Sequence, residues 1–243
     1  MPIRNVKAQR KYRATLNTLL AFIFLLLLLS PYVYLILSSL KDPVAIQAYP
    51  PAIIFKPTFE NYVKVFGDVN LIPYVRNSTI VASCNTVLSL AFAIPAAYSL
   101  ARHRFRLKET LAYMFLAIQM APAVALLFSF MVMANRLGLH DTWLILIILY
   151  LPWNIPFAVW MLRNFVADIP IALEEAAIVD GCTRLSAFLR VTFPLLLPGL
   201  LTTGVFIFIG AWNEFVIAFF LTAKRAATLP TTVDFFLTYG MYQ

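Results

Sequence analysis

The amino-acid sequence predicts an all-α integral membrane protein, on the evidence of its composition and of the distances between its charged residues. Of its 243 residues, 62% are hydrophobic and only 12% are charged. A soluble domain is typically about 45–50% apolar and about 25% charged, so this balance excludes a water-soluble globular enzyme and a disordered chain. We therefore expect most of the apolar surface to face lipid or other membrane-spanning helices.

Five long uncharged stretches predict five membrane-spanning helices. A span needs about 20 mainly apolar residues, and each stretch is at least that long. The first stretch is too long for the apolar part of a signal peptide, and no small-x-small cleavage site follows it. We thus predict a polytopic helical bundle with a cytoplasmic tail, 1–13, and a single transmembrane domain, 14–243. The predicted spans are 14–40, 77–101, 110–135, 142–162 and 195–223.

The distribution of lysine and arginine predicts the orientation. Twelve of the 19 basic residues lie in the N-terminal tail and in the loops after the second and fourth spans, and seven lie on the other side. The positive-inside rule then places the N-terminus in the cytoplasm and the loops around 41–76 and 135–141 outside. The same distribution explains the net charge of +8, so we predict no nucleic-acid partner.

The cysteines and histidines are isolated from one another. Cys84 lies in an apolar run and Cys182 in a polar loop, while His103 and His140 are far apart in the chain. This pattern predicts neither a disulfide framework nor a metal site.

Proline occurs within several predicted spans. Each proline removes a backbone hydrogen bond, and the freed carbonyl must find another partner in lipid. Bent helices of this kind often line a cavity, although proline is also common in membrane helices generally. The residues concerned are Pro31, Pro95, Pro122, Pro152, Pro156 and Pro198, with a cluster at Pro152–Pro156.

The predicted cytoplasmic loop 168–194 is unlike the other loops. Asp168 followed by Pro170 is a signal for the start of a helix, and Gly181 is a natural stop. Leu185, Phe188, Leu189 and Thr192 share one face of a second short helix. We predict two short helices that meet at Gly181 in a compact cytoplasmic knob. The alternative is an interfacial hairpin that only connects two spans.

The knob carries small and charged residues together. Ala176 and Ala177 allow another surface to approach closely, and Glu175, Asp180 and Arg184 surround that contact with charge. Glu174 and Glu175 lie near the positive end of the first short helix.

The spacing within this loop resembles the EAA loop of ATP-binding-cassette (ABC) importer permeases. The chain has Glu175-Ala176-Ala177, three residues, Gly181, nine residues, then Val191-x-Phe193-Pro194, where the family pattern is EAA-x3-G-x9-I-x-L-P. Two positions depart conservatively, and Cys182 stands where the family commonly has alanine. The resemblance implies the fold of a type I importer permease.

Further segments resemble the carbohydrate branch of that family, the maltose-type second permease subunit. The resemblance covers nearly the whole chain from about residue 15, and it implies a sixth span after Thr228-Leu229-Pro230 that the sequence does not contain. The segments are Phe59-Glu60-Asn61-Tyr62, Asn77-Ser78, Ala96-Ala97-Tyr98-Ser99-Leu100-Ala101-Arg102, Gly138-Leu139-His140-Asp141-Thr142 and Trp212-Asn213-Glu214-Phe215.

The resemblance also implies the mechanism and the partners. The knob inserts into an ATP-binding subunit, whose closure switches the spans between inward-open and outward-open states. No glycine precedes a lysine, so the chain has no P-loop, is not an enzyme, and relies on partners for ATP and Mg²⁺. Those partners are a second permease subunit that forms a heterodimer with this chain, two copies of an ATP-binding subunit and an external solute-binding protein. The resemblance places the complex in a prokaryotic inner membrane. The coupling residues are Glu174, Glu175, Ala176, Ala177, Asp180, Gly181 and Arg184.

A sugar pathway needs amide and carboxyl groups for hydroxyls and aromatic faces for the ring. Polar groups at membrane depth are functional candidates, although asparagine and glutamine also lock helices together and tryptophan also sits at interfaces. Glu214 is the only charged residue within the five predicted spans. The candidates are Gln119, Trp153, Asn154, Trp160, Trp212, Asn213 and Glu214.

Three other functions fit the residues of the spans less well than a sugar permease. A permease for a polyamine should carry several acids in its spans, and one for an oxyanion should carry bases; the spans contain neither set. A membrane-embedded enzyme needs a nucleophile with a base or paired carboxylates, which are also missing from the spans. An uncoupled scaffold or channel subunit would not need the EAA spacing.

Overall fold

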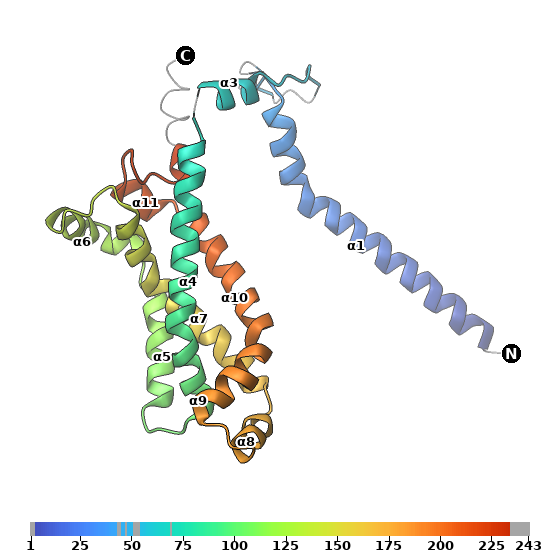
Figure 1. The fold of residues 1–243 in the computed structure, drawn as a ribbon. Coiled ribbons are helices and arrows are strands. Elements are labelled where there is room, and N and C mark those ends of the chain that lie inside the picture. Colours follow the sequence, from blue (N-terminus) through green and yellow to red (C-terminus); the bar gives the residue numbers. More distant parts are fainter. Residues whose placement is uncertain (1–2, 43–44, 47, 51–53, 69, 234–243) are drawn as a thin grey trace. The chain divides into compact units, whose positions relative to one another are not determined.

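The computed structural model describes residues 3–42, 45–46, 48–50, 54–68 and 70–233 (Figure 1). The chain divides into two units, Met1–Asn70 and Leu71–Gln243, and each is described by itself. Within the described residues the regular structure is helical throughout, which confirms the predicted all-α class. Four helices are long and apolar enough to cross a membrane, or five if one bent pair counts as a span.

The first unit contains α1 (Ile3–Ser39) and α3 (Glu60–Asp68). The part of α1 from Arg13 to Ser39 is apolar enough to span a membrane, as predicted for 14–40. The same helix already begins at Ile3, so residues 3–13 of the predicted tail are helical, while the apolar span begins at Arg13. At the other end, the Asn61 amide donates to the carbonyls of Ser39 and Lys41 at 3.0 and 2.7 Å, which attaches α3 to the end of α1.

The second unit is built around three long helices that pack against one another, α4 (Ile72–Arg102), α7 (Trp143–Asp168) and α10 (Phe193–Trp212). These helices cover the predicted second and fourth spans and the first part of the predicted fifth span. The shorter elements are α5 (Lys108–Gln119), α6 (Ala123–Arg136), α8 (Ile171–Val179), α9 (Arg184–Ala187), the π-helical turn η1 (Phe188–Thr192), α11 (Val216–Leu221) and the 3₁₀ turn η2 (Leu229–Thr231).

The predicted third span, 110–135, is not one continuous helix. It is broken into α5 and α6, whose axes are bent by 84°. The break falls at Met120–Pro122, where Pro122 has no N–H to donate. The carbonyl of Ala121 at the break accepts a hydrogen bond from the Trp153 indole at 3.2 Å. A contact from a distant helix thus stabilises a bend that the uncharged stretch did not reveal.

The predicted fifth span, 195–223, and the predicted second short helix of the knob both have different boundaries. The helix begins at Arg184 and runs through α9 and η1 into α10, so the short helix is not a separate element. It then ends at Trp212, and α11 follows after a break. The Glu214 carboxylate accepts hydrogen bonds from the backbone N–H groups of Ile217 and Ala218, at 2.9 and 3.1 Å, which satisfies the start of α11.

The core of the second unit consists of two apolar clusters. One includes Val81, Ala82, Leu146 and Leu221, and the other includes Ala93 and residues of α7 and α10. Small residues on α4 let the helices approach closely, as is usual in membrane bundles. Proline does not break these helices, since Pro95, Pro152, Pro156 and Pro198 all lie inside continuous α-helix.

Candidate functional site: the α8 knob and the bundle interior

Helix α8 and the turn after it form the predicted knob. The helix begins directly after Pro170, whereas Asp168 is the last residue of α7. At the other end Gly181 has φ +92, a conformation that favours glycine. The Cys182 N–H donates to the Ala177 carbonyl and the Gly181 N–H to the Ile178 carbonyl, both at 3.0 Å. These two bonds are those of a Schellman motif, so the glycine ends the helix as its position predicts.

One side of the knob is open to solvent. Glu175, Ala176, Asp180, Gly181 and Arg184 are exposed, and Ala177 is half-buried. The two alanines therefore present little more than backbone, with charged groups on both sides. This surface combines small side chains with exposed charged groups, as the sequence predicts for the knob.

Glu174 differs from the other six coupling candidates because it faces inward. Its carboxylate forms an ion pair with Arg102 at the end of α4, with 2.7 Å between Oε1 and Nε, and both side chains are less than a tenth exposed. The Tyr98 hydroxyl donates to the other oxygen at 2.7 Å. Burial by itself would raise the pKa of Glu174, but the hydrogen bonds from Tyr98 and Arg102 and the charge of Arg102 lower it overall. The carboxylate is therefore held in its ionised form.

Two asparagines join α4 to α7 in the middle of the bundle. Asn85, which sequence reasoning did not single out, is completely buried and donates to the Ile147 carbonyl at 3.0 Å. Its own side-chain oxygen accepts a hydrogen bond from Asn154 at 2.6 Å. Asn154 thus contacts a neighbouring helix, which was the alternative to a substrate contact.

Gln119 and Trp153 meet at the break between α5 and α6. The Gln119 amide donates to the Trp153 carbonyl at 3.5 Å, and the Trp153 ring lies edge-on to Phe130 at 6.2 Å between centroids. Two of the pathway candidates therefore contact each other where the predicted third span is interrupted.

Glu214 and Trp212 lie beside the second helix break. Besides the two backbone donors of α11, the Glu214 carboxylate accepts a hydrogen bond from the Tyr150 hydroxyl at 3.0 Å. Trp212 stacks on Phe208 with 5.6 Å between centroids. Asn213 is exposed and donates to the Ile209 carbonyl of its own helix.

Trp160 lies apart from these residues. It borders Leu100, Ala112 and Val159, and the Arg163 guanidinium lies 5.5 Å from its ring centroid. Its indole N–H is buried and has no acceptor among the described residues. The structure therefore does not bring the seven pathway candidates together at one place.

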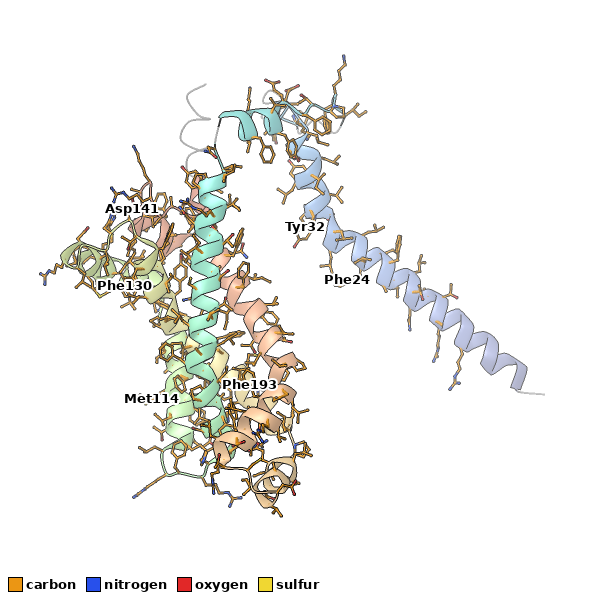
Figure 2. All side chains as sticks on the ribbon, in the orientation of Figure 1. Phe24, Tyr32, Met114, Phe130, Asp141 and Phe193 are labelled. Carbon is orange, nitrogen blue, oxygen red and sulfur yellow. The ribbon has the colours of Figure 1, made fainter. Side chains whose placement is uncertain are left out.

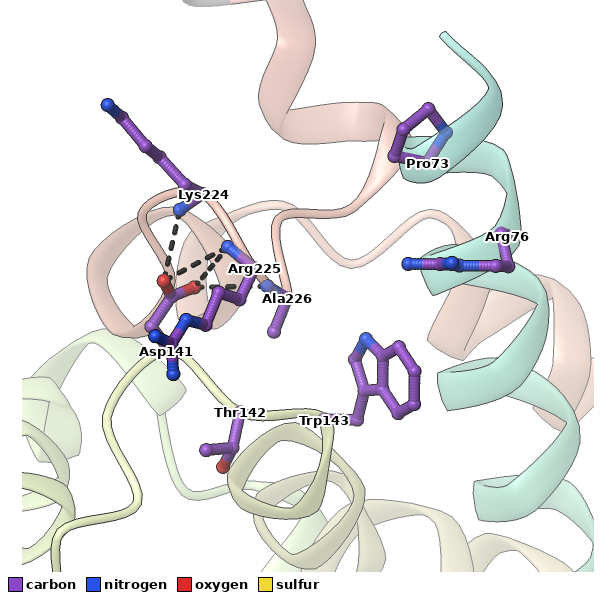
Figure 3. Close-up of a pocket in the computed structure, with 8 residues that line it drawn as sticks. All are labelled: Pro73, Arg76, Asp141, Thr142, Trp143, Lys224, Arg225 and Ala226. Atoms are coloured by element: carbon purple, nitrogen blue, oxygen red, sulfur yellow. Dashed lines mark hydrogen bonds between the residues drawn. The ribbon is translucent and has the colours of Figure 1, made fainter.

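At the opposite end of α4 from the knob, Asp141 organises a loop that sequence reasoning did not anticipate (Figures 2 and 3). Its carboxylate accepts hydrogen bonds from the backbone N–H groups of the four residues 223–226, at 2.9–3.1 Å. Burial by itself would raise the pKa of Asp141, but these donors lower it to about 2. The residue precedes a span in the sequence, and nothing in its surroundings indicated a partner some 80 positions away.

A cavity of about 450 Å³ opens beside this loop. Arg76 lies over the Trp143 ring, 5.6 Å from its centroid, and the Trp143 indole donates to Asn77 at 3.0 Å. The Asn77 amide in turn donates to the carbonyls of Arg225 and Ala227. Figure 3 shows Arg76, Trp143 and the loop around the cavity. Both sides of it are therefore fixed by hydrogen bonds to α4 and to Asp141.

Known proteins with similar sequences are membrane components of transport systems. The family model described as the inner membrane component of binding-protein-dependent transport systems matches residues 90–242. A probable ABC transporter permease of Sinorhizobium fredii is 37% identical over 223 residues, covering 91% of this chain and 79% of that protein. The trehalose/maltose transport system permease of Thermococcus litoralis is 32% identical over 220 residues, covering 89% and 78%.

A solved structure has the same fold. It is a bacterial ABC transporter involved in the import of the acidic polysaccharide alginate, with a TM-score of 0.71 and 24% sequence identity over 95% of this chain and 81% of that one. The long apolar helices and the family match define a multi-pass membrane permease. The chain belongs to the family of inner membrane components of binding-protein-dependent transport systems, in its carbohydrate branch.

Proposed function

We propose that this chain is the permease subunit of an ATP-driven importer for an uncharged sugar, working by alternating access. The observation that carries the proposal is the exposed surface of α8, where Glu175, Ala176 and Gly181 occupy the positions of the EAA pattern. The family and the sugar named in the T. litoralis relative support the same function.

The coupling partner is an ATP-binding subunit that receives the knob. Small side chains let its surface approach the α8 backbone, and Asp180 and Arg184 supply charges at the margin. ATP and Mg²⁺ are bound in that partner, since none of the seven glycines here precedes a lysine. Two such subunits, a second permease subunit and an external solute-binding protein complete the importer, and the knob lies in the cytoplasm.

An uncharged solute suits the polar groups of the spans. Glu214 is the only charged residue within 77–101, 110–135, 142–162 and 195–223. Its carboxylate already accepts three hydrogen bonds from Tyr150, Ile217 and Ala218. A charged solute would enter these spans without a free opposite charge, whereas hydroxyl groups can exchange hydrogen bonds with amides such as Gln119.

Native mass spectrometry of the complex, extracted from its own membrane, tests the proposal. We expect this subunit with one other multi-pass protein and two copies of an ATP-binding subunit. Ala176→Trp should remove the ATP-binding copies, because a large side chain blocks close approach to α8. Leu137→Trp, a matched substitution at an exposed position after α6, should retain them.

A functional variant tests coupling independently. Proline fixes its own φ at about −65°, whereas Gly181 has a φ of +92. Gly181→Pro should therefore disrupt the turn that ends α8. We expect normal membrane insertion with loss of ATP-driven sugar uptake. A wild-type complex without ATP-binding subunits would contradict the proposal and favour an uncoupled scaffold or channel subunit, while uptake of a charged solute in place of sugars would favour a permease for another solute.

A further inference from the structure

Two neighbouring glutamates on α8 lie in different surroundings, one buried and one exposed. Successive residues of an α-helix are turned by about 100°, so Glu174 and Glu175 cannot share one environment. Glu175 is exposed on the partner side, whereas only 6% of Glu174 is exposed. The knob therefore has an outer face for the partner and a carboxylate that holds it to the bundle.

Both carboxylate oxygens of Glu174 connect α8 to the end of α4. One carboxylate oxygen pairs with Arg102 Nε and the other accepts from the Tyr98 hydroxyl, both at 2.7 Å. The Arg102 guanidinium also donates from Nη2 to the Ile169 carbonyl, at 2.7 Å, in the segment between α7 and α8. One arginine thus fixes both the helix and the segment that leads into it.

The same cluster reaches the π-helical turn η1. The Tyr98 ring packs edge-on against Phe188 with 4.8 Å between centroids, and Phe188 contacts Phe193 at 6.2 Å. Tyr98 therefore contacts α8 through its hydroxyl and η1 through its ring. Three elements, α4, α8 and η1, meet at one tyrosine and one ion pair.

A buried ion pair restricts how two helices can be oriented relative to each other. Its charges must leave water, so the arrangement is stable only when geometry is good and the remaining hydrogen-bonding groups have partners. Apolar contacts would allow α8 to slide or rotate on the bundle, whereas this cluster permits one register. The segments on either side of α8, Ile169–Pro170 and Asp180–Thr183, are not helical and would otherwise allow it to turn.

We propose that Glu174 is a positioning residue that makes α8 and the end of α4 move as one body, so that displacement of the knob is transmitted to the spans. The inference rests on the proposed function and adds the route by which movement leaves α8. Glu175 and the alanines receive the push from the ATP-binding subunit, and Glu174 with Arg102 and Tyr98 carries it to α4.

The test measures solute imported per ATP hydrolysed by the complete complex in proteoliposomes. Glu174→Gln keeps the size and an acceptor oxygen but removes the charge. We expect the number of solutes per ATP to fall at least tenfold, while both ATP-binding copies remain bound and ATP hydrolysis no longer depends on the solute-loaded binding protein. Glu109→Gln is the matched control, since Glu109 forms an exposed ion pair with Arg163 at 3.3 Å, and it should leave the ratio unchanged.

A second variant separates transmission from stability. Replacing the whole cluster by apolar residues, Tyr98→Phe with Arg102→Met and Glu174→Leu, should keep the complex folded, because no buried charge is left unpaired. We expect this variant to assemble and to hydrolyse ATP with the same loss of coupling. If Glu174→Gln does not fold, this variant tests the role of Glu174 in its place. Restored coupling would overturn the inference by showing that the cluster only stabilises the fold.

The two proposals fail differently. If the wild-type complex lacks ATP-binding subunits or shows no ATP-dependent uptake, the proposed function is wrong. If the wild-type complex is coupled and Glu174→Gln keeps the wild-type ratio, only the role of Glu174 is wrong.

Discussion

At the scale of single residues, Asp141 shows how one carboxylate can organise a loop. Asp141→Asn replaces an acceptor oxygen by an amide that cannot accept from the N–H groups of residues 223–226. Hydrogen bonds to a charged group are worth about 1.5–3 kcal/mol, which corresponds to roughly tenfold or more in the opening of the loop. Lys224 and Arg225 are trypsin sites, so we expect correspondingly faster tryptic cleavage after them. Asp180→Asn, at an exposed position on the knob, should leave that cleavage unchanged.

The pH dependence of this loop follows from the same contacts. The folded pKa of Asp141, about 2, lies below its ordinary value of 3.8, so the ionised form stabilises the loop. That stabilisation is complete above about pH 4 and is lost as the pH falls through 2. Hydrogen-exchange protection of the amides 223–226, corrected for intrinsic rates, should decline across this range. Protection that stays constant down to pH 2, or that falls only when the pH rises, would contradict the assignment.

Residue types and spacing pointed to the residues of the knob but did not reveal that Glu174 is buried while Glu175 is exposed. The EAA spacing identified Glu175, Ala176 and Gly181 because that motif is contiguous in the chain. It could not separate Glu174 from Glu175, since the partner of Glu174 lies 72 positions away at Arg102. Asn85 escaped notice for the same reason, because an asparagine in an apolar helix shows its role only when the neighbouring helix is in place.

At the scale of elements, uncharged stretches predicted where helices lie but not whether they are continuous. Pro152 and Pro156 lie inside α7 without breaking it, whereas Pro122 lies at an 84° bend. The difference arises from tertiary contacts, since the carbonyl exposed by the bend accepts from Trp153. The break before α11 likewise depends on Glu214 satisfying two N–H groups. The Trp153 contact could not be inferred from the local sequence, because its partner lies 32 positions away.

The packing of α10 on α7 depends on a glycine. A Cβ at Gly199 would lie 2.5 Å from Cγ and 2.9 Å from Cβ of Phe165, whereas one at Gly210 in the same helix would meet nothing within 4 Å. Overpacking typically costs about 1–3 kcal/mol, so Gly199→Ala should lower the thermal stability in detergent by roughly 2–4 °C for each kcal/mol lost. Gly210→Ala should not, because alanine favours helix. Equal effects of the two variants would show that Phe165 moves aside without cost.

At the scale of the whole molecule, the second unit has two differently built ends. The α8 knob lies at one end of α4, and the loop held by Asp141 and Asn77 lies at the other (Figures 1 and 2). The long helices α4, α7 and α10 connect the two ends through apolar clusters. An importer that receives energy at one face and solute at the other needs such a division. The distribution of basic residues predicts which end faces the cytoplasm, and this orientation stays a prediction.

Cysteine labelling tests that orientation directly. With Cys84→Ser in place, the native Cys182 reports on the knob and Lys224→Cys reports on the Asp141 loop. We expect a membrane-impermeant maleimide to label Lys224→Cys in intact spheroplasts, whereas Cys182 should react only after permeabilisation, because the basic loops hold the knob in the cytoplasm. Each reporter is measured in a background without the other, using Cys182→Ser as the control. Labelling of Cys182 in intact spheroplasts would show that the topology is the opposite of the predicted one. The knob would then lie outside the cytoplasm, where no ATP-binding subunit could reach it.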